Sequence, residues 1–165
     1  MIRFFIIMVL VVVSDQLTKL WILENFALYE STTLIPGFFN FTFLRNTGAA
    51  FGMLSGMPLI WRQVFFISIA VIALVVLILM QHKMGRGKFW HTLSFAFIGG
   101  GAVGNVIDRV RDGSVIDFLD VYIGKYHWPA FNVADSGIFV GVCIFLLLQF
   151  LEDDEGEENK VQPVE

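Results

Sequence analysis

Residues 64–80 read VFFISIAVIALVVLILM, which is seventeen consecutive residues without a charged side chain. A helix needs about 20 predominantly apolar residues to cross the hydrocarbon core of a bilayer, so this stretch predicts a membrane-spanning helix. On either side of it, three further stretches are long and apolar enough to cross a bilayer, at residues 4–23, 89–107 and 129–151. Pro129 suits the first turn of the last helix, where the missing N–H of proline costs nothing. The sequence therefore predicts an α-helical membrane protein with four transmembrane helices.

The composition agrees with a membrane protein. Of 165 residues, 56% are hydrophobic and only 16% are charged, and the mean hydropathy is +0.73. A soluble domain normally carries about a quarter charged residues. These values exclude a disordered chain, a nucleic-acid-binding protein and an ordinary soluble enzyme. The one cysteine, Cys143, permits neither an internal disulfide nor a cysteine-based metal cluster.

The net charge of −4 comes from the C-terminal end of the chain. Residues 152–165 contain seven acidic residues and one lysine, and the rest of the chain has eight acidic and ten basic residues. We therefore expect a single membrane domain over residues 1–151. An acidic, disordered, cytoplasmic tail is expected over residues 152–165.

The basic residues predict the orientation in the membrane. Residues 81–88 carry three basic residues in eight, whereas residues 24–63 carry two in forty. By the positive-inside rule the short connection is cytoplasmic, so both termini are cytoplasmic and the longer connections, 24–63 and 108–128, lie outside. Three basic residues within 108–128 weaken this contrast.

The outer connection at residues 24–63 is too long for a simple turn. Residues 39–43 (FNFTF) alternate between apolar and polar, which is typical of a half-buried strand. Pro36 and Gly37 predict a turn before it, and residues 32–35 are the candidate partner strand. Residues 114–123, in the second outer connection, are also compatible with a strand. We expect a small sheet on the outer membrane surface.

Polar residues within the expected spans lie toward their outer ends. Asp15 and Lys19 are four residues apart, so they share a helix face, either as a structural ion pair or as part of a site. In the third span, Gly100 and Gly104 form a small-xxx-small pattern, which predicts close helix packing.

Two short patterns repeat the same spacing near the outer interface. Asn105 and Asp108 end the third span, and Asn132 and Asp135 open the fourth. Residues three apart share a helix face. If both faces point inward, these four polar side chains converge.

The aspartates in this region are candidates for acid–base chemistry. An aspartyl hydrolase needs two carboxyl groups that share one proton, because the ionised group activates water while the neutral group protonates the carbonyl oxygen. Asp135, in apolar sequence without a neighbouring base, is the best candidate for one of them. Asp117 is the favoured partner, although spacing alone leaves Asp108 and Asp120 open. Asp108 is followed by Arg109, which suits a structural salt bridge.

Five motifs resemble those of the lipoprotein signal peptidases, also called signal peptidase II. In chain order they read DQLTK at 15–19, NTGAAFG at 46–52, GGAVGNVIDR at 100–109, VIDFLD at 115–120 and FNVADS at 131–136. Each motif is short, but all five occur in family order on four expected spans.

The resemblance implies an aspartic endopeptidase of the bacterial inner membrane, with its active site near the outer leaflet. It would cut prolipoproteins before a cysteine that carries diacylglyceryl, and peptide-like inhibitors such as globomycin would bind the same site. The implied fold has four spans, a small outer sheet and a short outer helix. Contact with membrane lipid and a monomeric state are expected, and no cofactor or metal is implied.

The resemblance also assigns roles to individual residues. The implied catalytic dyad is Asp117 and Asp135. The residues implied to bind substrate or inhibitor, or to support the site, are Asp15, Lys19, Asn46, Gly48, Asn105, Asp108, Arg109 and Asn132.

Two other classes of protein are compatible with parts of this sequence. Intramembrane Asp, Asn and Lys also mark ion pathways, so a small ion or proton transporter or channel is the main alternative. The inner halves of the expected spans carry no comparable polar residues, which disfavours a continuous path. A non-catalytic assembly factor that packs through Gly100 and Gly104 would leave the paired Asn/Asp patterns unexplained.

Overall fold

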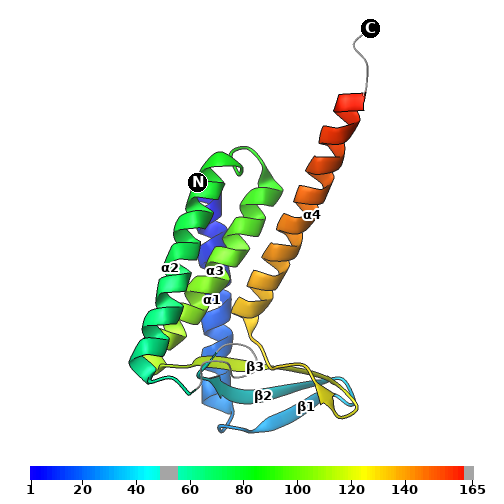
Figure 1. The fold of residues 1–165 in the computed structure, drawn as a ribbon. Coiled ribbons are helices and arrows are strands. Elements are labelled where there is room, and N and C mark those ends of the chain that lie inside the picture. Colours follow the sequence, from blue (N-terminus) through cyan, green and yellow to red (C-terminus); the bar gives the residue numbers. More distant parts are fainter. Residues whose placement is uncertain (49–55, 162–165) are drawn as a thin grey trace.

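A computed structural model describes residues 1–48 and 56–161, with side chains as far as residue 152. The elements in chain order are α1 (Ile2–Asn25), β1 (Ser31–Ile35), β2 (Phe39–Asn46), α2 (Leu59–Lys83), α3 (Phe89–Asp112), β3 (Val115–Ile123), β4 (Tyr126–His127) and α4 (Val133–Val161). Figure 1 shows the four helices as a bundle with the strands across one end. The N-terminus and the C-terminal end of α4 lie at the opposite end of the bundle.

Three of the helices are long and apolar enough to cross a membrane. They are Ile2–Asn25, Leu59–Lys83 and Val133–Glu152, with mean hydropathies of 1.9, 2.9 and 2.1. At 1.5 Å per residue, a helix of 24 residues is about 36 Å long, which exceeds a hydrocarbon core of about 30 Å. These helices confirm three of the expected spans, and the first two extend the expected ranges at both ends.

The helix α3 differs from the other three because its glycines bring neighbouring helices close. It contacts α1, α2 and α4, and α4 most extensively. A Cβ atom at Gly100 would lie 2.7 Å from Val11 Cβ, and one at Gly101 would clash with the backbone oxygen of Ala134. The close packing predicted for this helix is therefore present. Because α3 faces protein on several sides, it buries polar side chains that a lipid-facing helix could not.

The strands form a four-stranded antiparallel sheet in the order β1-β2-β3-β4. All three stretches predicted to be strands are strands, and residues 36–38 form the expected turn, with Gly37 at φ +79°. The buried side chains of Ile22, Phe43, Ile116 and Phe118 pack together and join the end of α1 to the sheet. This packing holds β3 against the helix ends and so fixes the position of Asp117.

Two predictions about the fourth helix are wrong. It begins at Val133 and not at Pro129, because Phe131 pairs with Leu119 of β3 and keeps the preceding residues extended. Asp135 therefore lies in the first turn of α4, and not six residues after the helix start as a start at Pro129 would place it. At its other end α4 continues to Val161, so residues 152–161 are helical where disorder was expected. Glu and Lys are good helix formers, and extending an existing helix is inexpensive.

The short outer helix implied by the resemblance is not among the elements of residues 1–48 and 56–161. Part of the NTGAAFG motif, residues 49–52, lies outside the described residues.

Candidate active site

The predicted site residues gather around one cavity where the helix bundle meets the sheet. The cavity has a volume of about 270 Å³. Six of the ten predicted residues line it: Asn46, Gly48, Asn105, Arg109, Asp117 and Asp135. The other four are fully buried nearby: Asp15, Lys19, Asp108 and Asn132. The structure therefore brings together residues that are up to 120 positions apart in the chain.

Asp117 reaches the cavity from β3 and is only 3% exposed. Its two carboxylate oxygens accept hydrogen bonds from amide groups, at 3.0 Å from Asn46 Nδ2 and 2.8 Å from Asn132 Nδ2. The Asn46 side chain comes from the neighbouring strand β2, which pairs with β3 in antiparallel register. Two strands and the entry to α4 thus fix the orientation of this carboxylate.

Asp135 reaches the same cavity from the first turn of α4. Its carboxylate accepts a hydrogen bond from Asn105 Nδ2 at 2.7 Å and one from the backbone N–H of Asn132 at 3.3 Å. In return, the Asn132 side-chain oxygen accepts from the backbone N–H of Asp135 at 2.8 Å. This reciprocal pair is a capping box, so the Asn132–Asp135 spacing marks a helix start as well as a candidate site.

Asn132 connects the two aspartates. Its side-chain nitrogen lies 2.8 Å from Asp117 Oδ1 and 3.2 Å from Asn105 Oδ1, while its side-chain oxygen caps the helix that carries Asp135. The side-chain amides of Asn105 and Asn132 each have several hydrogen-bond partners. The carboxylates of Asp117 and Asp135, which these amides contact, therefore have little freedom to turn. Such fixed geometry is what proton transfer between a carboxyl group and a bound water requires.

A second group of charged residues lies deeper in the bundle and is fully buried. Lys19 Nζ lies 2.8 Å from Asp15, 2.7 Å from Asp108 and 3.2 Å from Asn105 Oδ1, so each of its three N–H donors has an acceptor. Asp15 also accepts from the backbone N–H of Ala134 at 2.9 Å. This network ties α1 and α3 to the first turn of α4.

Arg109 closes another side of the cavity. Its guanidinium donates to the backbone oxygens of Asn105 at 3.2 Å and Gly48 at 3.3 Å. The group also lies 4.3 Å from the ring centre of Phe66 on α2, a cation–π distance. Arg109 therefore links α3, α2 and the end of β2, and it places a positive charge at the cavity.

The surroundings of Asp117 shift its protonation equilibrium. Burial, followed by the negative charge of Asp135, raises the pKa of Asp117 to about 7. The hydrogen bonds from Asn46 and Asn132 and the charge of Lys19 act in the opposite direction but do not cancel this rise. At neutral pH the site therefore holds two carboxyl groups of which one readily keeps a proton.

The two alternatives left open by the sequence have other environments. Asp108 is fully buried against Lys19 and also accepts from the backbone N–H of Ile116 at 3.2 Å. The oxygens of Asp120 bind Asn40 Nδ2 and His127 Nδ1, both at 2.8 Å. Neither aspartate lines the cavity.

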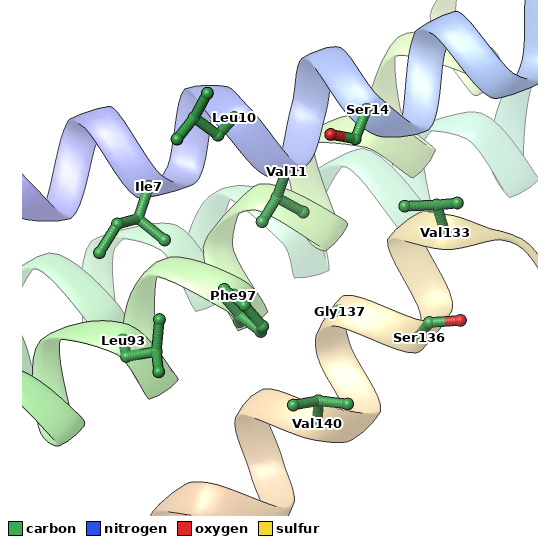
Figure 2. Close-up of a pocket in the computed structure, with 10 residues that line it drawn as sticks. All are labelled: Ile7, Leu10, Val11, Ser14, Leu93, Phe97, Val133, Ser136, Gly137 and Val140. Carbon is green, nitrogen blue, oxygen red and sulfur yellow. The ribbon is translucent and has the colours of Figure 1, made fainter.

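Two apolar cavities lie along α4, and the first of them adjoins the site cavity. The first, here called the α4 cavity, has a volume of about 390 Å³ and shares Trp128, Phe131 and Asp135 with the site cavity. The second, the bundle cavity, has a volume of about 530 Å³ and shares Ser136 and Val140 with the α4 cavity. Figure 2 shows the side chains of α1, α3 and α4 that line the bundle cavity, which are apolar except for Ser14 and Ser136.

The family model for signal peptidase (SPase) II matches residues 7–151. The chain belongs to the signal peptidase II family. It is 46% identical to the lipoprotein signal peptidase of Syntrophus aciditrophicus (strain SB) over 152 residues, which are 92% of this chain and 94% of that protein. It is 44% identical to the lipoprotein signal peptidase of Alteromonas mediterranea over 158 residues, which are 95% and 86% of the two chains.

Solved structures agree with the family. A bacterial membrane enzyme determined by the in meso method at 2.3 Å resolution superposes with a TM-score of 0.83, at 36% identity. The match covers 98% of this chain and 94% of that one. Signal peptidase II enzymes are aspartic peptidases, which hydrolyse peptide bonds, so the family supports an enzyme and gives no support to the transporter alternative.

Some residues around the signal peptidase II site were not predicted from the sequence to belong to it. Residues 128–131 line the site cavity, and none of them is among the predicted site residues. His127 and Asn40 hold Asp120, and neither was singled out. The available signal was the alternating strand at residues 39–43, which places the side chains of Asn40 and Thr42 on the opposite face from the phenylalanines.

Proposed function

We propose that this protein is a membrane-embedded aspartic endopeptidase that removes signal peptides from prolipoproteins, with Asp117 and Asp135 as its catalytic dyad. The observation that carries this proposal is that two carboxyl groups from separate elements line one cavity, where the pKa of one of them is raised to about 7. A buried pair of this kind holds a single proton over a neutral pH range.

The dyad would hydrolyse the peptide bond with a bound water. The ionised carboxylate takes a proton from the water, whose oxygen attacks the scissile carbonyl carbon. The protonated carboxyl group donates its proton to the carbonyl oxygen, which gives a neutral tetrahedral diol. On collapse, a hydroxyl proton returns to the dyad and the leaving amine is protonated, so the C–N bond breaks and the dyad again holds one proton. The proton belongs to the pair, so neither aspartate has a fixed role.

The remaining site residues would position the dyad and the substrate. The amides of Asn46, Asn105 and Asn132 hold the carboxylates through donated hydrogen bonds. Arg109, at the rim with Gly48, offers a positive charge to a substrate carbonyl or to a peptide-like inhibitor such as globomycin. Asp15, Lys19 and Asp108 would act indirectly, because they tie the three helices that carry the site.

The apolar cavities suit the lipid part of the substrate. Diacylglyceryl on the substrate cysteine carries two acyl chains. The α4 cavity is lined by Asp135 and shares Ser136 and Val140 with the bundle cavity, so these two apolar cavities are the proposed positions of the chains. The burial of acyl chains there would bring the lipidated cysteine, and the bond before it, to the dyad. An unmodified precursor would lack this binding contribution.

The proposed arrangement has four spans, with α3 as the additional one, in the bacterial inner membrane. The basic connection at residues 81–88 supports cytoplasmic termini and a sheet on the outer surface. In that orientation the site lies near the outer leaflet, where a membrane-anchored substrate meets water. We expect the enzyme to act as a monomer, since the site is built from one chain.

The test is cleavage of a purified prolipoprotein in detergent, with and without diacylglyceryl on its cysteine. Wild-type protein is compared with Asp117→Asn, Asp135→Asn and the matched control Asp112→Asn, a partly exposed aspartate paired with Arg111 outside the cavity. The proposal predicts cleavage of the lipidated form by wild type and by the control, and none by the dyad variants. Cleavage that survives both dyad substitutions would contradict it.

A further inference from the structure

A polar cluster outside the dyad holds the segment that forms one wall of the site cavity. Residues 128–131, here called the wall segment, all line that cavity, and Trp128 and Phe131 also line the α4 cavity. The wall segment leads from the two-residue strand β4 to the start of α4. Its position therefore affects the width of both cavities.

The wall segment is attached to β3 by backbone hydrogen bonds at its two ends. Trp128 N–H donates to the Val121 oxygen at 2.8 Å, and Phe131 N–H donates to the Leu119 oxygen at 3.1 Å. The intervening Pro129 has no N–H to donate. The first attachment follows directly from β4, which pairs with β3 through only two residue pairs, so side-chain contacts add to the stability of this short strand.

Side chains on three strands supply these contacts. His127 Nδ1 of β4 lies 2.8 Å from Asp120 Oδ1 on β3, and the other Asp120 oxygen accepts from Asn40 Nδ2 of β2 at 2.8 Å. The His127 ring also stacks on Tyr122, with ring centres 4.8 Å apart and planes 10° from parallel. The Tyr122 hydroxyl in turn accepts from the Gly37 N–H of the β1–β2 turn at 3.0 Å.

The environment of Asp120 shows that this contact is more than a surface pair. Asp120 is only 8% exposed, and each of its oxygens has a side-chain donor. The loss of the histidine would leave a largely buried carboxylate oxygen without that donor, which is unfavourable. The His127 side chain itself is half exposed, so a substitution there changes the contact without opening the core.

We propose that His127 is a positioning residue: through Asp120 it holds the wall segment against β3 and so sets the affinity for substrate, an inference that rests on the proposed peptidase function. The donors to the dyad carboxylates, Asn46, Asn105 and Asn132, lie outside the wall segment. Loss of the His127 contact therefore raises KM and leaves kcat nearly unchanged.

The experiment compares His127→Ala, His127→Asn and Tyr126→Leu with wild type, using a lipidated prolipoprotein. In His127→Ala we expect KM to rise about three- to tenfold and kcat to stay within about twofold. In His127→Asn the side-chain amide replaces the Nδ1 donor, so KM returns most of the way to the wild-type value. Tyr126 is 75% exposed and shares β4, so Tyr126→Leu is the matched control and leaves KM unchanged.

Hydrogen exchange provides a readout that does not depend on activity. In His127→Ala, amide exchange should accelerate in peptides that cover β4 and the wall segment and stay unchanged in α1 and α2. This result with an inactive wild type would contradict the peptidase function and leave the structural role of His127 in place. Unchanged exchange in His127→Ala would overturn the positioning role.

The kinetic results can also overturn the inference. A fall in kcat at constant KM would place the effect of His127 on the dyad and not on substrate binding. Equal effects of His127→Ala and His127→Asn would show that the hydrogen bond to Asp120 is irrelevant. In a double-mutant cycle, Asp120→Ala combined with His127→Ala should raise KM no more than the larger single effect, and additive effects would contradict the coupling.

Discussion

Two pairs of aspartates in this protein are linked through Asn105, and the groups that contact them differ. Asp15 and Asp108 each contact the ammonium group of Lys19, at 2.8 and 2.7 Å. The donors that contact Asp117 and Asp135 are amides of asparagines. A full positive charge in contact stabilises the ionised form of a carboxyl group far more than an amide does.

The difference separates a structural role from a chemical one. Asp15 and Asp108 share Lys19, whose three N–H donors all have acceptors. Such a network is suited to joining helices. Two carboxyl groups held by amides keep the option of sharing a proton. The first prediction tests the chemical pair, the second tests the structural pair, and the next two sharpen the comparison.

The largest expected effect is on catalysis by the dyad. Asp117→Asn or Asp135→Asn should reduce kcat/KM by about 10⁴-fold, because an amide can neither accept the proton from water nor return it. The amides still occupy the same volume, so thermal unfolding in detergent should change little. A variant that loses activity together with its fold would not support a catalytic role, and residual activity within about tenfold of wild type would contradict it.

The largest expected effect on stability is at Lys19. Lys19→Met removes the cation between Asp15 and Asp108, which should lower the free energy of unfolding by about 3–5 kcal/mol, as when one partner of a buried ion pair is removed. Chemical unfolding in detergent micelles measures this change. Lys88→Met is the matched control, since Lys88 pairs with Glu152 at an exposed position, and it should have little effect. Equal effects of the two variants would refute the structural role of the buried network.

The pH dependence of cleavage should follow the dyad. Because the pKa of Asp117 is raised to about 7, the proton that the dyad needs is lost as the pH rises through that value, and kcat/KM should fall about tenfold per pH unit above it. The free energy of unfolding should also fall as the pH rises. Between about pH 4 and pH 7 the folded state keeps a proton that the unfolded chain releases, so stability decreases as the pH rises. The decrease should disappear in Asp117→Asn, and a wild-type rate that is constant from pH 6 to pH 9 would contradict the prediction.

The smallest expected effect links the two groups through Gly104. A Cβ atom there would lie 2.6 Å from Asp15 Oδ2 and 3.2 Å from Ala134 Cβ, so Gly104→Ala should displace Asp15 and the first turn of α4. We expect a loss of about 1–3 kcal/mol in stability and a lower kcat. Gly99→Ala is the matched control, because its Cβ atom would make ordinary contacts, the nearest at 3.4 Å from Met8 Sδ. If both variants behave alike, the close approach at Gly104 does not position the site.

Much of the fold was predictable because local sequence patterns determine it. The apolar runs predicted the helices, and the alternation at residues 39–43 predicted β2, including its pairing with residues 32–35. The start of α4 was not predicted correctly. Pro129 suggested a first helical turn, but the pairing of Phe131 with β3 decided the position, and the capping box at Asn132 and Asp135 was the better local signal.

The site was predictable as a set of polar residues but not as a set of roles. Asn105–Asp108 and Asn132–Asp135 have the same spacing, yet Asp108 is bound to Lys19 and Asp135 lines the cavity. The difference depends on a residue 89 positions before Asp108. Asp117 and Asp120 likewise differ only through tertiary partners. Sequence spacing gives the helix face, whereas long-range packing decides which carboxylate has a cation.

The most direct measurement of the central claim is the infrared absorption of protonated carboxyl groups, in protein labelled at aspartate with ¹³C. A shared proton on the dyad predicts a labelled carboxylic-acid band at pH 6 that disappears as the pH rises past about 7 and is lost in Asp117→Asn. The band should persist in Asp112→Asn. A wild-type spectrum without this band, or a band that remains in Asp117→Asn, would contradict the account.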